Sequence, residues 1–196
     1  MIARFFLLLL IVLSAYCLYY FRYSLPIVGP LLIKKYYNSG AYEKEVQQLC
    51  EDAKQYFSTI TVKPNSLIIF DVDDTAVYNM RFRAKRPDLI KPKTLALMPV
   101  FKLYNYLIDR GFKIIFLTSR DSYETTIEDL TAAGYKDYVG IICMNDFHDD
   151  YTALWKWEKR KELSKEYNIE GSIADRKRDF FDNYSGHAVK LPNYLY

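Results

Sequence analysis

The sequence predicts an α/β fold built on a doubly wound parallel sheet with helices on both faces. Two short, mainly apolar runs, at residues 67–70 and 113–118, have the length and composition of strands buried on both faces. Longer segments with apolar residues three and four apart alternate with such runs, as in parallel βαβ units. At 196 residues the chain is long enough for one domain with a full core.

The spacing of apolar residues, together with the turn-forming and helix-ending residues between segments, predicts where each element of this fold lies. Residues 41–57 carry apolar side chains at helical spacing, and a Pro-Asn-Ser turn separates that helix from the first strand. The second and third helices end before Gly111 and Gly134, where a helix-terminating glycine is usual. We therefore expect, in chain order, helix 41–57, strand 67–70, helix 97–108, strand 113–118, helix 122–133, strand 139–144, helix 152–167 and strand 171–174.

Composition and charge are those of a globular chain without a dedicated nucleic-acid surface. Hydrophobic residues make up 51% of the chain and charged residues 26%, as in folded domains. The net charge of +3 is small for a nucleic-acid-binding protein, so no nucleic-acid partner is expected. If a disulfide forms, Cys50 and Cys143 are the expected pair, because Cys17 lies in an N-terminal apolar run. The preferred interpretation makes both small core residues.

The N-terminal segment is expected to direct the chain to a membrane or across it. Residues 5–21 carry no charge and are flanked by arginines, a pattern shared by export signals and membrane anchors, and their length is at the lower limit for a spanning helix. The best cleavage sequence, at residues 15–17, is poor, so an uncleaved signal-anchor is favoured over a cleaved signal. Residues 1–35 are thus expected to form a hydrophobic signal-anchor or signal peptide with a linker. Residues 36–196 are expected to form the folded domain, membrane-anchored or exported to the secretory or periplasmic side.

A basic, proline-interrupted segment over residues 81–93 follows the first strand. It has no clear hydrophobic period and is typical of a loop or a small cap. Two interpretations stay open. The segment is either a solvated linker or an electropositive lid that attracts anionic substrates.

The first strand leads directly into three carboxylates, Asp71, Asp73 and Asp74. Repulsion between carboxylates this close is costly unless a cation or a shared proton relieves it. A bend after Asp71 would direct one side chain and one backbone carbonyl to the same point, which suits a hard metal ion. The C-terminal ends of strands are also where open α/β sheets bind ligands. A solvated turn is the alternative, and the all-apolar strand before the acids disfavours it.

Two other predicted strand ends carry polar groups that can converge on these acids. Thr118 and Ser119 lie at the end of one strand, Asp175 and Asp179 follow another, and Lys156 lies near the start of the helix before that second strand. Taken singly, Thr118 and Ser119 are typical of a helix N-cap, and Lys156 of a surface lysine. Together, two carboxylates, a hydroxyl and an ammonium group suit phosphoryl transfer through a carboxylate nucleophile. Mg²⁺ suits such an all-oxygen site better than most transition metals.

The chain resembles the haloacid dehalogenase (HAD) superfamily, whose phosphatases carry a DxDxT first motif, matched by residues 71–75. More narrowly, it is similar to the acid phosphatase group that includes bacterial class B and class C enzymes and plant vegetative storage proteins. The narrower match covers residues 39–196 and contains several motifs in the family order. These are Ser39-Gly40-Ala41-Tyr42, residues 71–75 with Asn79, Phe116-Leu117-Thr118-Ser119-Arg120, Gly134-Tyr135, Lys156 with Arg160, Asp175 with Asp179, and Lys190-Leu191-Pro192-Asn193. The resemblance implies a HAD-like, Rossmannoid three-layer α/β/α sandwich with a parallel sheet and a small or absent cap.

The resemblance also implies a role for each matched residue. Asp71 is expected to be the nucleophile and a Mg²⁺ ligand. Asp73 is expected to be the general acid/base and to give its backbone carbonyl to the metal, and Asp175 to complete the protein's metal ligands. Asp74 receives no role and is expected to be a variable position. The other expected site residues are phosphate-binding Thr118, Ser119 and Lys156, and supporting Asp179, Arg120 and Arg160.

The implied function is a Mg²⁺-dependent phosphomonoesterase that acts through an aspartyl-phosphate on a small phosphate ester, with nucleotides among the candidates. A phosphotransferase of the same chemistry and a non-catalytic storage or interaction protein are the alternatives. The intact Asp71 favours a working enzyme, because some vegetative storage relatives lose this nucleophile. Two positions depart from the family pattern: Ala174 replaces the usual Gly, and Tyr78 replaces a common Ser. Tyr78 is expected to influence substrate choice by narrowing the pocket or stacking on a base.

Overall fold

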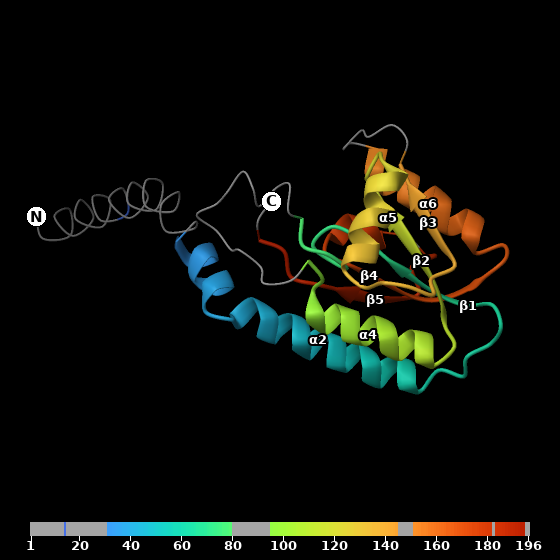
Figure 1. Cartoon of the computed structure of the whole chain (residues 1–196), viewed down its shortest axis with the longest axis horizontal. Coiled ribbons are helices and arrows are strands. Elements are labelled where there is room, and N and C mark those ends of the chain that lie inside the picture. The colour runs from blue at the N-terminus through green and yellow to red at the C-terminus, as the bar shows by residue number, and fades with distance from the viewer. Residues whose placement is uncertain (1–13, 15–30, 80–94, 145–150, 182, 195–196) are drawn as a thin grey trace, which may run out of the picture.

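The computed structural model describes residues 14, 31–79, 95–144, 151–181 and 183–194, and Figure 1 shows their arrangement. The predicted signal or anchor at residues 5–21, apart from Ser14, lies outside the described residues, as does the basic segment 81–93. Within the ranges described, no helix combines the length and the apolar character needed to cross a membrane.

Parallel strands form one five-stranded sheet in the order β3-β2-β1-β4-β5, which confirms the predicted sheet. The strands are β1 (Ser66–Phe70), β2 (Lys113–Thr118), β3 (Gly140–Cys143), β4 (Asn168–Ala174) and β5 (His187–Lys190). The sequence did not predict β5, because its four residues contain no apolar run. For the same reason β4 begins three residues before the predicted start, at a polar asparagine.

The central strand, β1, is buried along its whole length, as its apolar sequence predicted. It pairs in parallel with β2 on one side and with β4 on the other. The backbone N–H of Asp71 extends the pairing with β4 by donating to the carbonyl of Ile173 at 2.9 Å. The first acid of the motif therefore lies at the middle of the sheet's C-terminal edge.

Helices cover both faces of the sheet and complete the three layers. Helices α2 (Ala41–Ser58) and α4 (Met98–Asp109) pack side by side on one face (Figure 1). Their buried residues share the larger core cluster with Leu130 of α5 (Tyr123–Ala132). On the other face, Trp155 and Leu163 of α6 (Thr152–Leu163) pack against apolar residues of β1 and β2.

Local features of the chain match several sequence expectations. Gly111 and Gly134 follow α4 and α5 with φ values of 89° and 91°, which confirms the predicted helix ends. Cys50 is a free thiol buried in the core, as the preferred interpretation held, and Cys143 is free and half-buried. Helix α6 ends at Leu163 instead of the predicted residue 167, because the chain turns there toward β4.

Candidate active site

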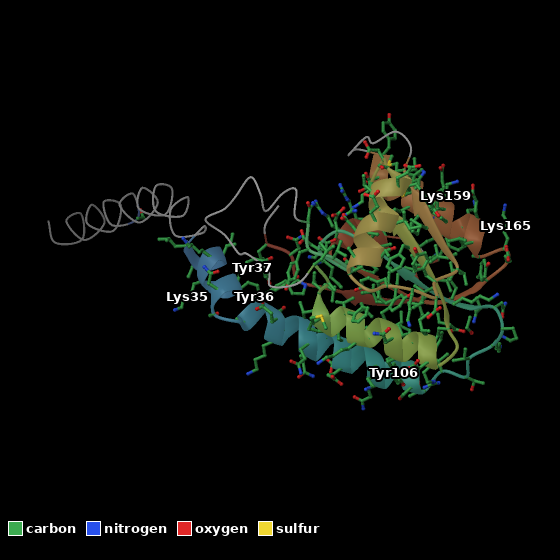
Figure 2. All side chains as sticks on the ribbon, in the orientation of Figure 1. Lys35, Tyr36, Tyr37, Tyr106, Lys159 and Lys165 are labelled. Carbon is green, nitrogen blue, oxygen red and sulfur yellow. The ribbon has the colours of Figure 1, made fainter. Side chains whose placement is uncertain are left out.

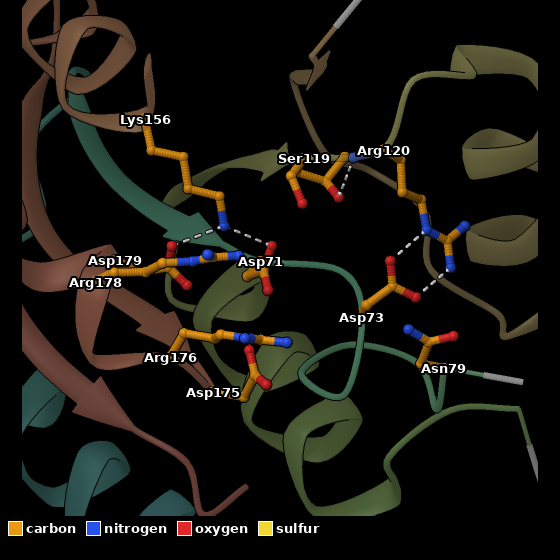
Figure 3. A pocket seen from close by; sticks show the side chains of 11 residues that line it. Asp71, Asp73, Asn79, Ser119, Arg120, Lys156, Asp175, Arg176, Arg178 and Asp179 are labelled. Carbon is orange, nitrogen blue, oxygen red and sulfur yellow. Dashed lines mark hydrogen bonds and ion pairs between the residues drawn. The ribbon is translucent and has the colours of Figure 1, made fainter. Parts of the chain in front are cut away.

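The C-terminal ends of β1, β2 and β4 surround a cavity of about 610 Å³, which we name the catalytic cavity (Figure 3). Parallel pairing brings the last residues of the three strands to the same edge of the sheet. After β4, the short 3₁₀ helix η2 (Lys177–Phe180) carries Asp179 to the cavity. The lining consists of charged and polar residues from these segments and from α6: Asp71, Asp73, Asn79, Thr118, Ser119, Arg120, Lys156, Asp175, Arg176, Arg178 and Asp179.

The chain turns sharply after Asp71, as the sequence predicted. The backbone N–H groups of Ala76 and Val77 both donate to the carbonyl of Val72, at 2.9 and 3.0 Å. Within this turn Asp74 has a φ of 51°, in the left-handed region that Asp and Asn tolerate better than most residues. The turn separates the acids, because Asp71 remains at the strand end while Asp73 faces Arg120 (Figure 3).

Asp71 and Lys156 form a buried ion pair at the centre of the cavity floor. The Nζ atom of Lys156 lies 2.8 Å from Oδ1 of Asp71 and 3.0 Å from Oδ1 of Asp179. Burial raises the pKa of Asp71, and Lys156 opposes this rise. Burial also disfavours the charge on Lys156, but Asp71 and Asp179 raise the pKa of the ammonium group above its usual value. The lysine therefore remains a cation between two acids.

Asp73 forms a second ion pair, with Arg120 at the end of β2. The Nε and Nη2 atoms of Arg120 each lie 2.8 Å from one carboxylate oxygen of Asp73, so the contact is bidentate. Nη1 of Arg120 also lies 2.7 Å from Oδ2 of Asp129 on α5. Burial opposes the charge of Arg120, yet the bonds to Asp73 and Asp129 raise its pKa above the usual value. The pair fixes the direction of the Asp73 carboxylate.

Three buried carboxylates, those of Asp71, Asp175 and Asp179, form a group that fits a hard divalent cation. One ligand atom from each lies within 4.8 Å of the others, and oxygen ligands are those that Mg²⁺ prefers. Burial, followed by the charge of Asp71, raises the pKa of Asp175 to about 7. Among the described residues, Oδ2 of Asp179 is buried without a hydrogen-bond partner. A bound cation would relieve both the repulsion and the unsatisfied oxygen.

The structure brings most of the predicted site residues together. Thr118 is buried at the end of β2, where its Oγ1 accepts a hydrogen bond from the backbone N–H of Arg120 at 3.3 Å, and Ser119 is half-buried beside it. Both line the catalytic cavity with Lys156, and the structure places Asp179 in the carboxylate group as well. The side chain of Asp73 lies outside that group, and the predicted role of its backbone carbonyl remains a prediction.

Two residues singled out in the sequence, Arg160 and Tyr78, are not among the described residues that line the catalytic cavity. Arg160 is 2% exposed on α6, one turn after Lys156, and is not among the described residues that line the cavity. Tyr78 is 8% exposed and belongs to the hydrophobic core. The expectation that Tyr78 narrows the pocket or stacks on a base is therefore not supported by its position, because its ring is used in packing.

Sequence reasoning missed two cations and one contact of the site. Arg176 and Arg178 flank the β4 end and line the cavity (Figure 3). Their position beside Asp175 and Asp179 was the signal that could have identified them. Asn193, which the sequence offered only as part of a C-terminal motif, donates a hydrogen bond to the carboxylate of Asp175.

Comparison with protein families gives a match over most of the chain. The model of the family described as "HAD superfamily, subfamily IIIB (Acid phosphatase)" matches residues 31–196. Tomato (Solanum lycopersicum) acid phosphatase 1 is 27% identical over 184 residues, covering 84% of this chain and 72% of the relative. The stem 28 kDa glycoprotein of soybean (Glycine max) is 29% identical over 184 residues, covering 83% and 72%. Vegetative storage protein 2 of Arabidopsis thaliana is 28% identical over 177 residues, covering 81% and 67%.

Solved structures share the fold. The class C acid phosphatase from Bacillus anthracis superposes with a TM-score of 0.65 at 17% identity, covering 85% of this chain and 84% of that one. A second structure of that enzyme, with tungstate bound, gives a TM-score of 0.62 at 18% identity with the same coverage. At such low identity the likeness establishes a common architecture.

Proposed function

Because this chain belongs to the HAD superfamily, subfamily IIIB, the acid phosphatases, we propose that it hydrolyses phosphomonoesters through an aspartyl-phosphate on Asp71. Membership supports phosphoric monoester hydrolysis, and the proposal adds the nucleophile, the metal and the kind of ester. The observation that carries it is the position of Asp71 at the end of the central strand, paired with Lys156 and grouped with two further carboxylates.

The reaction has two steps, each with a role for one acid of the first motif. In the first, a carboxylate oxygen of Asp71 attacks phosphorus, the ester P–O bond breaks, and Asp73 gives a proton to the leaving oxygen. In the second, Asp73 takes a proton from water, and the water oxygen attacks phosphorus to release phosphate and free Asp71. Arg120 orients the Asp73 carboxylate through its bidentate contact.

Other residues of the cavity bind the transferring phosphate and hold the metal. Lys156 supplies a fixed positive charge, and Thr118 and Ser119 supply hydroxyl groups at the end of β2. Arg176 and Arg178 add positive charge at the cavity wall. The metal ligands would be Asp71, Asp175, the backbone carbonyl of Asp73 and, directly or through water, Asp179. When bound, Mg²⁺ supplies positive charge that neutralises the phosphate oxygens.

The substrate class in this proposal is a small phosphate ester, with nucleotides as candidates. Phosphotransfer to another acceptor remains the alternative within the same chemistry, since the aspartyl-phosphate is common to both. A non-catalytic storage protein is the alternative from another class, and relatives named vegetative storage proteins give it weight. The intact Asp71–Lys156 pair favours the enzyme.

Export through the N-terminal apolar segment is also part of the proposal. Residues 5–21 have the composition of a signal or anchor. Three of the relatives are named glycoproteins, and attachment of glycans to asparagine is typical of surface loops in secreted proteins. Intact-mass measurement of the mature protein decides between a cleaved signal and a retained anchor.

The experiment that tests the function is hydrolysis of p-nitrophenyl phosphate by the purified full chain with and without Mg²⁺, beside Asp71→Asn. We expect Mg²⁺-dependent release of phosphate by the natural chain and none above background by the variant. Asn keeps the shape of Asp but cannot act as the nucleophile, so it is a matched control. If no ester in a broad panel yields Asp71-dependent phosphate, the enzyme proposal fails and the storage alternative stands.

A further inference from the structure

A second cavity of about 610 Å³, which we name the basic cavity, adjoins the catalytic cavity. Asp175, Arg176 and Arg178 line both cavities, so these residues form a shared wall. Four lining residues of the basic cavity are cationic: Arg176, Lys177, Arg178 and Lys190. The two cavities therefore meet at these three residues, and the basic cavity lies on the positively charged side of this shared wall.

The acids of the basic cavity do not balance these four cations. Its lining includes two acids, Glu45 and Asp175, and both accept hydrogen bonds from neutral groups. The hydroxyl of Tyr36 donates to Glu45 at 2.6 Å, and the side-chain amide of Asn193 donates to Asp175. The remaining lining residues carry no side-chain charge. The potential in the basic cavity is consequently positive.

Lys190 shows how closely the cations are gathered. It is half-buried on β5, and its Nζ donates to the backbone carbonyl of Leu191 at 2.5 Å. Burial lowers the pKa of its ammonium group, Asp175 raises it, and the nearby charges of Lys177 and Arg176 lower it further. Within the described part of the chain, no carboxylate forms an ion pair with Lys177 or Lys190. A bound anion would supply the missing negative charge.

We propose that the basic cavity binds a second phosphate group of the substrate, so that the chain prefers phosphomonoesters that carry another phosphate. This proposal rests on the proposed phosphomonoesterase function, because the first phosphate must react at Asp71. Phosphate suits the cavity because ammonium and guanidinium groups form strong, charge-assisted hydrogen bonds with it. The shared wall contributes guanidinium groups, and Lys177 and Lys190 contribute ammonium groups that the catalytic cavity does not use.

The test compares matched pairs of substrates that differ by one phosphate: adenosine 3′,5′-bisphosphate with AMP, and fructose 1,6-bisphosphate with fructose 6-phosphate. We expect a higher kcat/KM for at least one bisphosphate than for its partner. In a Lys177→Gln/Lys190→Gln variant this preference falls by about tenfold or more, the value of a lost charge-assisted contact. Activity on p-nitrophenyl phosphate stays unchanged, because that ester has no second phosphate. A Lys177→Gln/Lys190→Arg variant keeps one of the two cations, so it should retain part of the bisphosphate preference that the double Gln variant loses.

Lys165→Gln is the matched control, since it removes the same charge from an exposed lysine far from the basic cavity. Tyr36 and Tyr37 bond to residues that line that cavity, and Lys165 lies on the opposite side of the domain from them (Figure 2). This control should leave the ratio of kcat/KM between each bisphosphate and its monophosphate partner unchanged. Equal loss on all substrates in the double variant, or no bisphosphate preference in the natural chain, would overturn the proposal. A second bound inorganic phosphate that disappears in the double variant, without any bisphosphate preference, would assign the cavity to free phosphate and overturn it too.

Calorimetry with Asp71→Asn separates this proposal from the function on which it rests. The variant should bind the bisphosphate more tightly than its partner, and the two lysine substitutions should remove the difference. If the natural chain hydrolyses no ester, the proposed function fails whatever the calorimetry gives. If it hydrolyses esters and Asp71→Asn shows no difference in binding, only the basic cavity proposal fails.

Discussion

The ion pairs of Asp71 with Lys156 and of Asp73 with Arg120 involve acids two residues apart, yet they differ in their access to water. The Lys156 and Asp71 side chains are 4% and 11% exposed, whereas those of Arg120 and Asp73 are 16% and 26% exposed. Both contacts measure 2.8 Å, so the pairs differ in their surroundings and not in their closeness. A nucleophile gains from a dry, fixed environment, while an acid/base must exchange protons with water. The two environments suit the two proposed roles.

Replacing the acids should have the largest effect on activity. Asp71→Asn should abolish turnover, and Asp73→Asn should lower kcat by about 10²–10⁴-fold, the usual worth of general acid/base catalysis. With p-nitrophenyl phosphate, whose leaving group needs no proton, Asp73→Asn should still accept the phosphate but release it slowly. Intact-mass spectrometry of quenched reactions should then find a phosphate adduct on Asp73→Asn and none on Asp71→Asn. An adduct on the Asp71 variant would assign the nucleophile elsewhere.

Replacing the two cations should give the next largest effects, and the losses should differ between the two ion pairs. Lys156→Met should lower kcat/KM by about 10²–10³-fold and lower the free energy of unfolding by about 3–5 kcal/mol, because it leaves buried acids without their partner. Arg120→Met removes a more exposed partner and should lower kcat/KM by only about tenfold. Lys159→Met is the control on the same helix, since Lys159 pairs with exposed Glu162. Kinetics and urea unfolding measure both effects, and equal losses in the two cavity variants would contradict the comparison.

The buried acids should also make stability depend on pH and metal. The pKa of Asp175 is about 7 in the folded, metal-free protein and about 4 in an unfolded chain. Between these values the folded state binds more protons, so its stability falls as the pH rises from about 4 to 7. Mg²⁺ replaces the proton, so it should raise Tm more at about pH 8 than at about pH 5.

Thermal melts with Mg²⁺ or EDTA test this expectation. Asp175→Asn should weaken both the pH dependence and the gain from Mg²⁺. If the Mg²⁺ gain were the same in Asp175→Asn as in the natural chain, the metal would have to bind elsewhere.

Asp74 should give the smallest effect of the acids in the first motif. It is buried, and its Oδ1 accepts a hydrogen bond from the backbone N–H of Asn79 at 3.1 Å. Asp74→Asn keeps an acceptor and tolerates the left-handed backbone, so activity should change by no more than about twofold. Asp74→Ala loses the acceptor and should cost about 1–3 kcal/mol of stability. Kinetics and urea unfolding of both variants check this, and a large activity loss in Asp74→Asn would give Asp74 a catalytic role.

Sequence reasoning predicted the strands best where their residues are buried on both faces. β1 and β2 are almost wholly buried, so each carries an unmistakable apolar run. β5 lies at the edge of the sheet, and only Val189 of its four residues is buried. Its place depends on pairing with β4, which no local pattern records.

The residues of the candidate site likewise divide into those that a local sequence pattern predicts and those whose contacts depend on the fold. Asp71, Asp73, Thr118 and Asp175 could be predicted because each lies at the end of a strand or just after it. The partner of Asp73 could not, because the contact with Arg120 joins residues 47 positions apart through a turn whose shape emerges only in the fold. Arg160, expected only as a supporting residue, is buried on α6 and is not among the described residues that line the cavity, so its supporting role stays a prediction.

The length of chain between the paired groups has a consequence for biosynthesis. Asp71 and Lys156 are 85 positions apart, and Asp175 bonds to Asn193, which follows β5 in the chain. A growing chain therefore contains Asp71 long before the ribosome has produced the lysine that pairs with it. Enzymatic activity can appear only after the sheet is nearly complete. The time at which phosphate release begins during refolding therefore reports when these distant residues come together, a late step that probes of helix content would miss.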